Sequence, residues 1–221
     1  MNGLDQQLAD RGPGLSGVSF ATMDAVEAHQ RFDQAGLAGR MASLSRLIEK
    51  PEGDEELRFS LAYAEPDATP GLNSFLCQHH SADRMREPEW LEHANGAIGL
   101  EGVTVIADEP EALEGAYTRY LQALGQSLDG LWRGQGRLDL PLGHDQALRF
   151  LTPQRAAKRY HGAPAALLAR TGPLVLTLRT GSLSETQRFY EANGLPTLTV
   201  PGDRVVLDPA LTDGTIIEFA E

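Results

Sequence analysis

An internal repeat constrains the fold of this chain more than any other feature. Three stretches, residues 17–37, 102–125 and 174–195, each begin with a short β-rich run, continue with a helix-like pattern and stop at a glycine. Several short strand-like runs follow each stretch, so the recurring unit is β-α-β-β-β. The spacing between the repeats is uneven, whereas solenoid repeats are tighter and more regular. The sequence therefore predicts an α+β fold built from three such units.

Each repeat has a specific helix start and stop. The residue before each helix can accept hydrogen bonds from the free N–H groups of the first turn, and an acidic residue follows three positions later. The predicted N-cap residues are Asp24, Asp108 and Ser182, the acidic residues are Glu27, Glu111 and Glu185, and the closing glycines are Gly36, Gly125 and Gly194. One more helix is predicted after Thr152, where Pro153 suits the first helical position.

The repeats suggest a division of the chain into segments. We expect a loose N-terminus at 1–14, a single β-α-β-β-β unit at 15–80, a polar linker or functional loop at 81–98, and paired units at 99–151 and 173–221 with a connector helix at 152–172. The last two units are joined by this short connector, so we expect them to pair with each other.

Charge and cysteine content exclude several classes of function. The chain of 221 residues has 19 Lys+Arg and 31 Asp+Glu, a net charge of −12. Phosphate backbones and anionic membrane surfaces repel such a chain, so neither nucleic acid nor a membrane is an expected partner. Cys77 is the only cysteine, which excludes an intrachain disulfide and a cysteine-rich zinc site. No apolar run approaches the ~18–20 residues of a membrane span, and the first residues lack the shape of a signal peptide, so we expect a cytoplasmic protein.

Four sequence segments carry a resemblance to a known family. They are residues 46–66, 71–80, 88–110 and 150–162, and the most specific piece is the Trp-x-x-His-x-Asn-Gly-Ala pattern from Trp90 to Ala97. In these segments the chain resembles the glyoxalase-like domain family of the vicinal oxygen chelate superfamily, which includes glyoxalase I, extradiol dioxygenases and bleomycin-resistance proteins. The resemblance implies that the β-α-β-β-β units form cupped mixed sheets around a cavity.

The resemblance also indicates where a metal would bind. In metal-dependent relatives, a His on the first strand and a Glu on the last strand of each unit converge on a divalent ion. In this chain the first-strand position falls on Glu101, and the last-strand positions fall on Glu218 and Arg149. Two alternatives stay open. A divalent metal would use Glu101, Glu218 and His79, whereas in a metal-free cavity Glu101, Arg149 and Glu218 would form ion pairs. The missing histidines favour the metal-free alternative.

The linker and the end of the unit that precedes it contribute the other candidate site residues. His79 and His93 are the candidate catalytic residues, because imidazole binds metals and exchanges protons near neutral pH. Trp90 and Asn95 are candidate substrate-binding residues, together with Glu101, Arg149 and Glu218. We expect His79 and His93 to border one cavity of about 300 Å³ or more. The alternative is that the histidines fix the linker, that Trp90 packs it on a sheet, and that Asn95 forms a turn.

These residues lead to two candidate functions. The first is a glyoxalase-like protein that acts on a small organic molecule, as a lyase or an isomerase. The second is a non-catalytic protein that binds and sequesters such a molecule.

Family members of this kind have four units, whereas this chain shows three, so the unit near residues 17–78 lacks a partner within the chain. An uncovered sheet face and strand edge favour association, so we expect a homodimer. Two alternatives stay open: the unit docks on the back of the paired units, or its partner is an upstream fourth unit that is missing from this reading frame.

Overall fold

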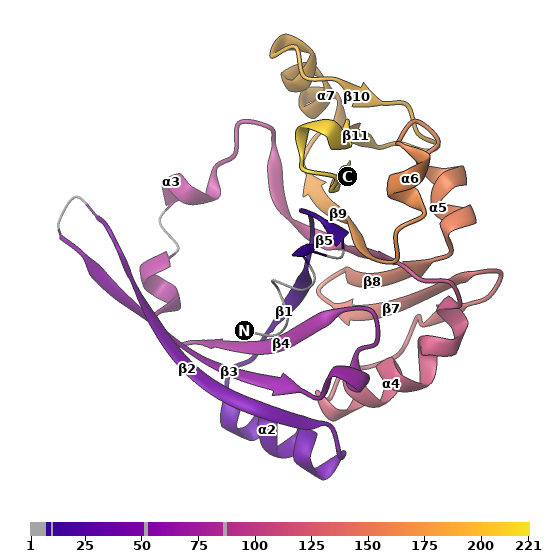
Figure 1. Cartoon of the computed structure of the whole chain (residues 1–221). Helices are drawn as coiled ribbons and strands as arrows, with labels where there is room; N and C mark the ends of the chain where they lie inside the picture. Colours follow the sequence, from indigo (N-terminus) through magenta and orange to yellow (C-terminus); the bar gives the residue numbers. More distant parts are fainter. Residues whose placement is uncertain (1–7, 10, 51–52, 86–87) are drawn as a thin grey trace. The chain divides into compact units, whose positions relative to one another are not determined.

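The computed structural model describes residues 8–9, 11–50, 53–85 and 88–221, which form two compact units (Figure 1). The four-stranded unit comprises Gly17–Leu91 and Gly115–Gln126. The eight-stranded unit comprises the described residues up to Ser16, together with Glu92–Glu114 and Ser127–Glu221. Both sheets mix parallel and antiparallel pairs, and helices cover them, so the predicted α+β class is confirmed.

The four-stranded unit contains one β-α-β-β-β repeat and a helix from the next repeat. Its elements are β1 (Gly17–Ala21), α2 (Ala25–Gln34), β2 (Ala38–Ile48), β3 (Glu55–Ala64), η1 (Pro66–Ala68), β4 (Asn73–His79), η2 (Ala82–Met85), α3 (Pro88–Leu91) and most of α4 (Glu114–Ala123). The strand order is β1-β4-β3-β2, with β1 parallel to β4 and the other pairs antiparallel.

The eight-stranded unit contains two further copies of this topology. Its elements are β5 (Ala97–Ile106), η3 (Pro110–Leu113), β6 (Trp132–Arg133), β7 (Arg137–Gly143), β8 (Gln146–Leu151), α5 (Pro153–Arg159), α6 (Ala165–Leu168), β9 (Gly172–Thr180), α7 (Leu183–Ala192), β10 (Thr197–Leu198), β11 (Val205–Leu207), η4 (Pro209–Leu211) and β12 (Ile216–Ala220). The orders β5-β8-β7-β6 and β9-β12-β11-β10 repeat that of the first sheet, and antiparallel β5 and β9 join them.

The side chains of α2 and α4 explain why both helices pack in the four-stranded unit. Phe32 of α2 and Tyr120 of α4 are fully buried and stack with ring centroids 5.2 Å apart. Tyr120 also accepts a hydrogen bond of 3.3 Å from Ser74 on β4. Tyr117, one turn earlier, donates to the carbonyl of Pro70 at 3.0 Å. Burial of these large aromatic rings stabilises the packing of α4 in this unit.

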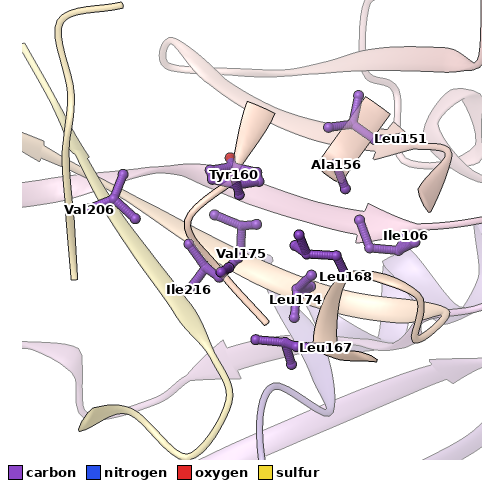
Figure 2. Packing of buried hydrophobic residues seen from close by; sticks show 11 residues of the cluster. Ile106, Leu151, Ala156, Tyr160, Leu167, Leu168, Leu174, Val175, Val206 and Ile216 are labelled. Atoms are coloured by element: carbon purple, nitrogen blue, oxygen red, sulfur yellow. The ribbon is translucent and has the colours of Figure 1, made fainter. Parts of the chain in front are cut away.

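Connector helices α5 and α6 cover part of one face of the eight-stranded sheet, which we call the connector face. Figure 2 shows the apolar cluster that forms there, in which Tyr160, the residue that follows α5, and Leu168 of α6 are buried with side chains from several strands. The strand residues of this cluster include Ile106, Val175 and Ile216. On the other face, a second cluster contains Tyr190 of α7 with Val205, Leu207 and Phe219.

Most of the predicted helix starts are confirmed, and one is wrong. The side chains of Asp24, Ser182 and Thr152 accept hydrogen bonds from backbone N–H groups of the first turns of α2, α7 and α5. Asp108 does not cap a helix, because Pro110 opens the 3-10 turn η3 and α4 begins only at Glu114. The closing glycines Gly36, Gly125 and Gly194 have φ values of +66°, +71° and +65°, which favour glycine.

The structure also bears on the expectations about membrane spans and about Cys77. Within the described residues, no helix combines the length and the apolar character that crossing a membrane requires. Cys77, on β4, is a free thiol, and burial raises its pKa above the ordinary value.

Candidate functional site

A row of polar residues crosses the connector face of the eight-stranded sheet. Strand register places Asp139 of β7 beside Arg149 of β8, and Arg149 beside Thr104 of β5. On the neighbouring strands, Thr177 of β9 lies beside Glu218 of β12. Paired side chains on neighbouring strands lie on the same face of a sheet. Thr177 pairs with Gly102, two residues before Thr104, so the five residues lie on one face as a row that is staggered between β5 and β9. The row contains two of the predicted site residues, Arg149 and Glu218.

Glu218 is the most deeply buried member of the row, with no exposed surface. Its carboxylate accepts hydrogen bonds from Arg159 Nη2 at 3.1 and 3.0 Å, from the Tyr160 hydroxyl at 3.1 Å and from Thr177 Oγ1 at 3.4 Å. Arg159 and Tyr160 lie at the end of connector helix α5. A buried carboxylate requires a paired cation and hydrogen bonds, and these three residues supply both.

The contacts of this cluster also shift the pKa values of Arg159 and Tyr160. Burial alone would lower the pKa of Arg159, but the charges of Tyr160 and Glu218 raise it above the ordinary value. Burial, together with the charge of Glu218, raises the pKa of Tyr160 above its ordinary value. At neutral pH the cluster therefore holds a guanidinium cation and a neutral phenol, whose hydroxyl donates a hydrogen bond to Glu218.

The other two charges of the predicted site have partners that differ from our prediction. Glu101 pairs with Arg204, from the loop between β10 and β11, at 3.4 Å. Arg149 pairs with Asp139 at 3.3 Å, and Asp139 also binds Arg137. The predicted ion pairs among Glu101, Arg149 and Glu218 are therefore wrong. Each charge is satisfied by a residue from another element.

A local irregularity of β5 places Glu101 near this row. The register of β5 against β9 shifts between Leu100 and Gly102, so Glu101 is the extra residue of a bulge. Gly102 permits this, because a Cβ there would overlap the carbonyl oxygen of Ala147 on β8. Glu101, Arg149 and Thr177 then line a cavity of about 10 Å³, which is the volume of about one water probe.

The contacts of Glu101 and Glu218 do not fit a divalent metal site, which was one of the two alternatives that the resemblance left open. Glu218 lies at the position expected for the acidic ligand, but its two oxygens are occupied by Arg159, Tyr160 and Thr177. Glu101 is held by Arg204. A cation at each carboxylate opposes the binding of a second cation. Among the described residues, no group of three or more His, Cys, Asp or Glu side chains could hold a metal ion.

The structure does not bring the candidate catalytic histidines into one compact unit. His79 ends β4 in the four-stranded unit, where its exposed ring makes an edge contact with Phe59 at a centroid distance of 4.3 Å. His93 is an exposed residue of the eight-stranded unit, and its carbonyl accepts a hydrogen bond from Gly96 at 2.8 Å. A shared catalytic site of His79 and His93 therefore stays a prediction.

The structure gives Trp90 and Asn95 clear local contacts. Trp90, on α3, is 46% exposed, and the Lys50 ammonium lies 5.7 Å from its ring centroid. Asn95 donates from Nδ2 to the Tyr190 hydroxyl at 3.0 Å, and its carbonyl accepts from Thr186 at 3.0 Å. Both partners of Asn95 lie on α7, so Asn95 joins the turn before β5 to this helix.

Sequence reasoning missed the partners of the predicted charges. Arg159 and Tyr160 lie within the segment 150–162 that carried the family resemblance, and a search of that segment for cations would have found Arg159. Arg204 follows the turn Pro201-Gly202-Asp203, and no sequence pattern indicates that its side chain reaches Glu101. Asp139 could have been found from the alternation in β7, which places it on the same face as Arg137.

Three solved structures share this fold. A hypothetical protein from Staphylococcus aureus matches with a TM-score of 0.61 at 12% identity, covering 97% of this chain and 69% of its own. A mutant of 4-hydroxymandelate synthase from Streptomyces coelicolor matches with a TM-score of 0.57 at 13% identity, covering 97% and 72%. The 2,3-dioxygenase LapB from Pseudomonas sp. KL28 matches with a TM-score of 0.55 at 13% identity, covering 93% and 71%. The fold is that of the vicinal oxygen chelate superfamily.

Within this superfamily, the family follows from the sequence. The model of the glyoxalase-like domain matches residues 2–121, which is more than half of the chain. The chain belongs to the glyoxalase-like domain family, as its sequence segments predicted. A search of curated proteins finds no match.

Proposed function

We propose that this glyoxalase-like protein binds a small organic molecule at the connector face without a divalent metal, and sequesters it rather than converting it. The observation that carries the proposal is the arginine at the expected metal position. Arg159 supplies the positive charge that a divalent ion would otherwise place against Glu218. The charge is fixed by the fold, so binding at this face does not require an exchangeable ion.

The polar groups available to a ligand are the guanidinium groups of Arg149 and Arg204. Their side chains are 22% and 25% exposed, so both remain accessible. Arg149 binds Asp139 through Nε, and Arg204 binds Glu101 through Nη1. A guanidinium has five N–H donors, so both side chains keep donors for carbonyl or carboxylate oxygens of a ligand. The cavity beside Arg149 holds about one water, so a ligand would contact the outer atoms of the guanidinium groups.

Metal analysis and ligand screening test this proposal together. The purified full chain should contain less than about 0.1 divalent metal per chain, and a chelator should leave its thermal midpoint unchanged. A thermal-shift screen of small carbonyl compounds should find ligands whose stabilising effect falls in Arg149→Gln and Arg204→Gln.

Arg188→Gln is the matched control, because Arg188 forms an exposed pair on α7 with Glu185. A stoichiometric metal that the chelator removes with loss of ligand binding would contradict the metal-free proposal. Turnover of a screened compound, with isomerised or cleaved product, would replace sequestration with the isomerase or lyase function.

A further inference from the structure

The eight-stranded unit contains a second candidate site, at the end of its sheet where β9 and β12 begin. A cavity of about 210 Å³ lies there, between the N-terminal segment and the residues that precede these strands. Its lining residues are Leu8, Arg11, Gly12, Pro13, Gly14, Leu15, Ser16, Arg170, Pro173, Leu174 and Gly214. This volume lies below the ~300–1,000 Å³ of pockets for drug-sized ligands, so the cavity suits a smaller molecule.

Two glycines position the two arginines of this cavity. Gly172 is buried, has a φ of +107°, and a Cβ on it would overlap the guanidinium of Arg11. The Arg11 guanidinium therefore lies directly against the Cα of Gly172, at the start of β9. Arg170 lies similarly near Gly214, where a Cβ would be 3.6 Å from its Nη1 atom. The chain thus holds two guanidinium groups at one end of the sheet.

Neither arginine has a carboxylate partner within the part of the chain that the structure describes. Arg11 Nε is buried and lacks any hydrogen-bond partner there. By contrast, Arg149, Arg159 and Arg204 all bind carboxylates. A buried donor that has lost its water is destabilising when it stays unpaired, and more so when it carries a charge.

The two positive charges also oppose each other. Burial lowers the pKa of Arg11, and the charge of Arg170 lowers it further. Arginine stays protonated at neutral pH in spite of such shifts, so the repulsion persists in the free protein. An anion between the two groups would relieve both the repulsion and the missing hydrogen bond.

We propose that this cavity binds a small organic carboxylate. A carboxylate matches the planar fork of a guanidinium in a bidentate geometry and would accept the free Nε proton of Arg11. Part of the remaining wall is apolar, with Leu15, Pro173 and Leu174. This wall favours an acid with a hydrocarbon or aromatic body over an inorganic anion, because it desolvates the apolar part of the ligand. The site lies outside the polar row of the connector face and does not depend on the function proposed there.

Benzoate is a suitable probe for this site, with benzamide as its neutral isostere and inorganic phosphate as a second anion. In calorimetric titrations of the full chain, benzoate should bind with a 1:1 stoichiometry, and benzamide and phosphate should bind at least tenfold more weakly. Arg11→Met and Arg170→Gln should each weaken benzoate binding at least tenfold. Arg188→Gln, an exposed control on α7, should leave it unchanged.

The alternative results each overturn the proposal. Equal affinity for benzoate and benzamide would show that the negative charge of the ligand does not contribute to binding. Tighter binding of phosphate would show that the cavity prefers an inorganic anion to an organic carboxylate. Absence of benzoate binding at 10 mM would show that the two arginines are satisfied within the chain. If Arg11→Met fails to fold, Arg170→Gln still tests the proposal. Full benzoate affinity in that variant would show that benzoate does not bind in this cavity.

Discussion

At the scale of single residues, the main finding is that charged side chains of the connector face satisfy one another across elements. Glu218 has no exposed surface, and its carboxylate is held by Arg159 and Tyr160. Such a buried pair adds little net stability compared with apolar residues of the same volume, but removal of one partner is costly. This asymmetry gives a sharp experimental test.

We expect Arg159→Met to lower the free energy of unfolding by about 3 kcal/mol, because it leaves the Glu218 carboxylate buried and unpaired. The double variant Arg159→Met, Glu218→Leu should recover most of this loss. Urea unfolding followed by circular dichroism measures both. A double variant as unstable as the single one would show that Arg159 acts by packing and not by its charge.

The pH dependence of thermal stability tests the contribution of Glu111. It accepts a hydrogen bond from the backbone N–H of Gly136 at 2.7 Å, and this bond lowers the pKa of Glu111 below its ordinary value of 4.5. A lowered pKa means that the contribution to stability is present above pH 4.5 and is lost as the pH falls through the folded-state pKa. Thermal midpoints of wild type and Glu111→Gln should therefore differ at pH 7 and approach each other as the pH falls below 4.5. A constant difference across this range would contradict the assignment.

At the scale of elements, the caps of the repeats allow a comparison between equivalent positions. Asp24 caps α2 through two backbone N–H groups, whereas Asp108, at the equivalent position, is exposed and caps no helix. We expect Asp24→Ala to lower the free energy of unfolding by about 1 kcal/mol. Asp108→Ala should change it by less than about 0.5 kcal/mol. Chemical denaturation measures both, and equal losses would show that the two residues have the same role.

The elements were more predictable than their side-chain partners. Alternating strands, capping residues and closing glycines are local features, so the sequence predicts α2 and α7 together with the glycines that end them. Asp108 was predicted wrongly because Pro110, two residues later, favours a 3-10 turn. Ion pairs such as Arg204 with Glu101 join residues far apart in the chain, and only the folded strands and loops decide which long side chain reaches which carboxylate.

At the scale of the whole molecule, the odd number of units favours association. The edge strand β2 has exposed apolar side chains, with Met41, Leu44 and Leu47 exposed by 39%, 46% and 67%. An edge strand with unpaired backbone groups and apolar side chains readily pairs with another chain. We therefore propose a homodimer formed through the four-stranded unit.

Light scattering at micromolar concentration should give twice the chain mass of 23.9 kDa. The variant Leu44→Lys, Leu47→Lys should shift the mass to that of one chain. Leu211→Lys, at an exposed leucine of η4, is the control and should stay dimeric. A wild-type protein that scatters as a single chain would reject the dimer.

The path of the chain has a consequence for synthesis. The chain leaves the four-stranded unit after Leu91 and returns to it at Gly115, so α4, which carries Tyr117 and Tyr120, is translated after a segment of the other unit. A ribosome therefore releases the sheet of β1 to β4 before the helix that buries Phe32. A gene fragment ending at Leu91 would encode that sheet and α2 without α4, so a single cut in the gene cannot separate the two units intact.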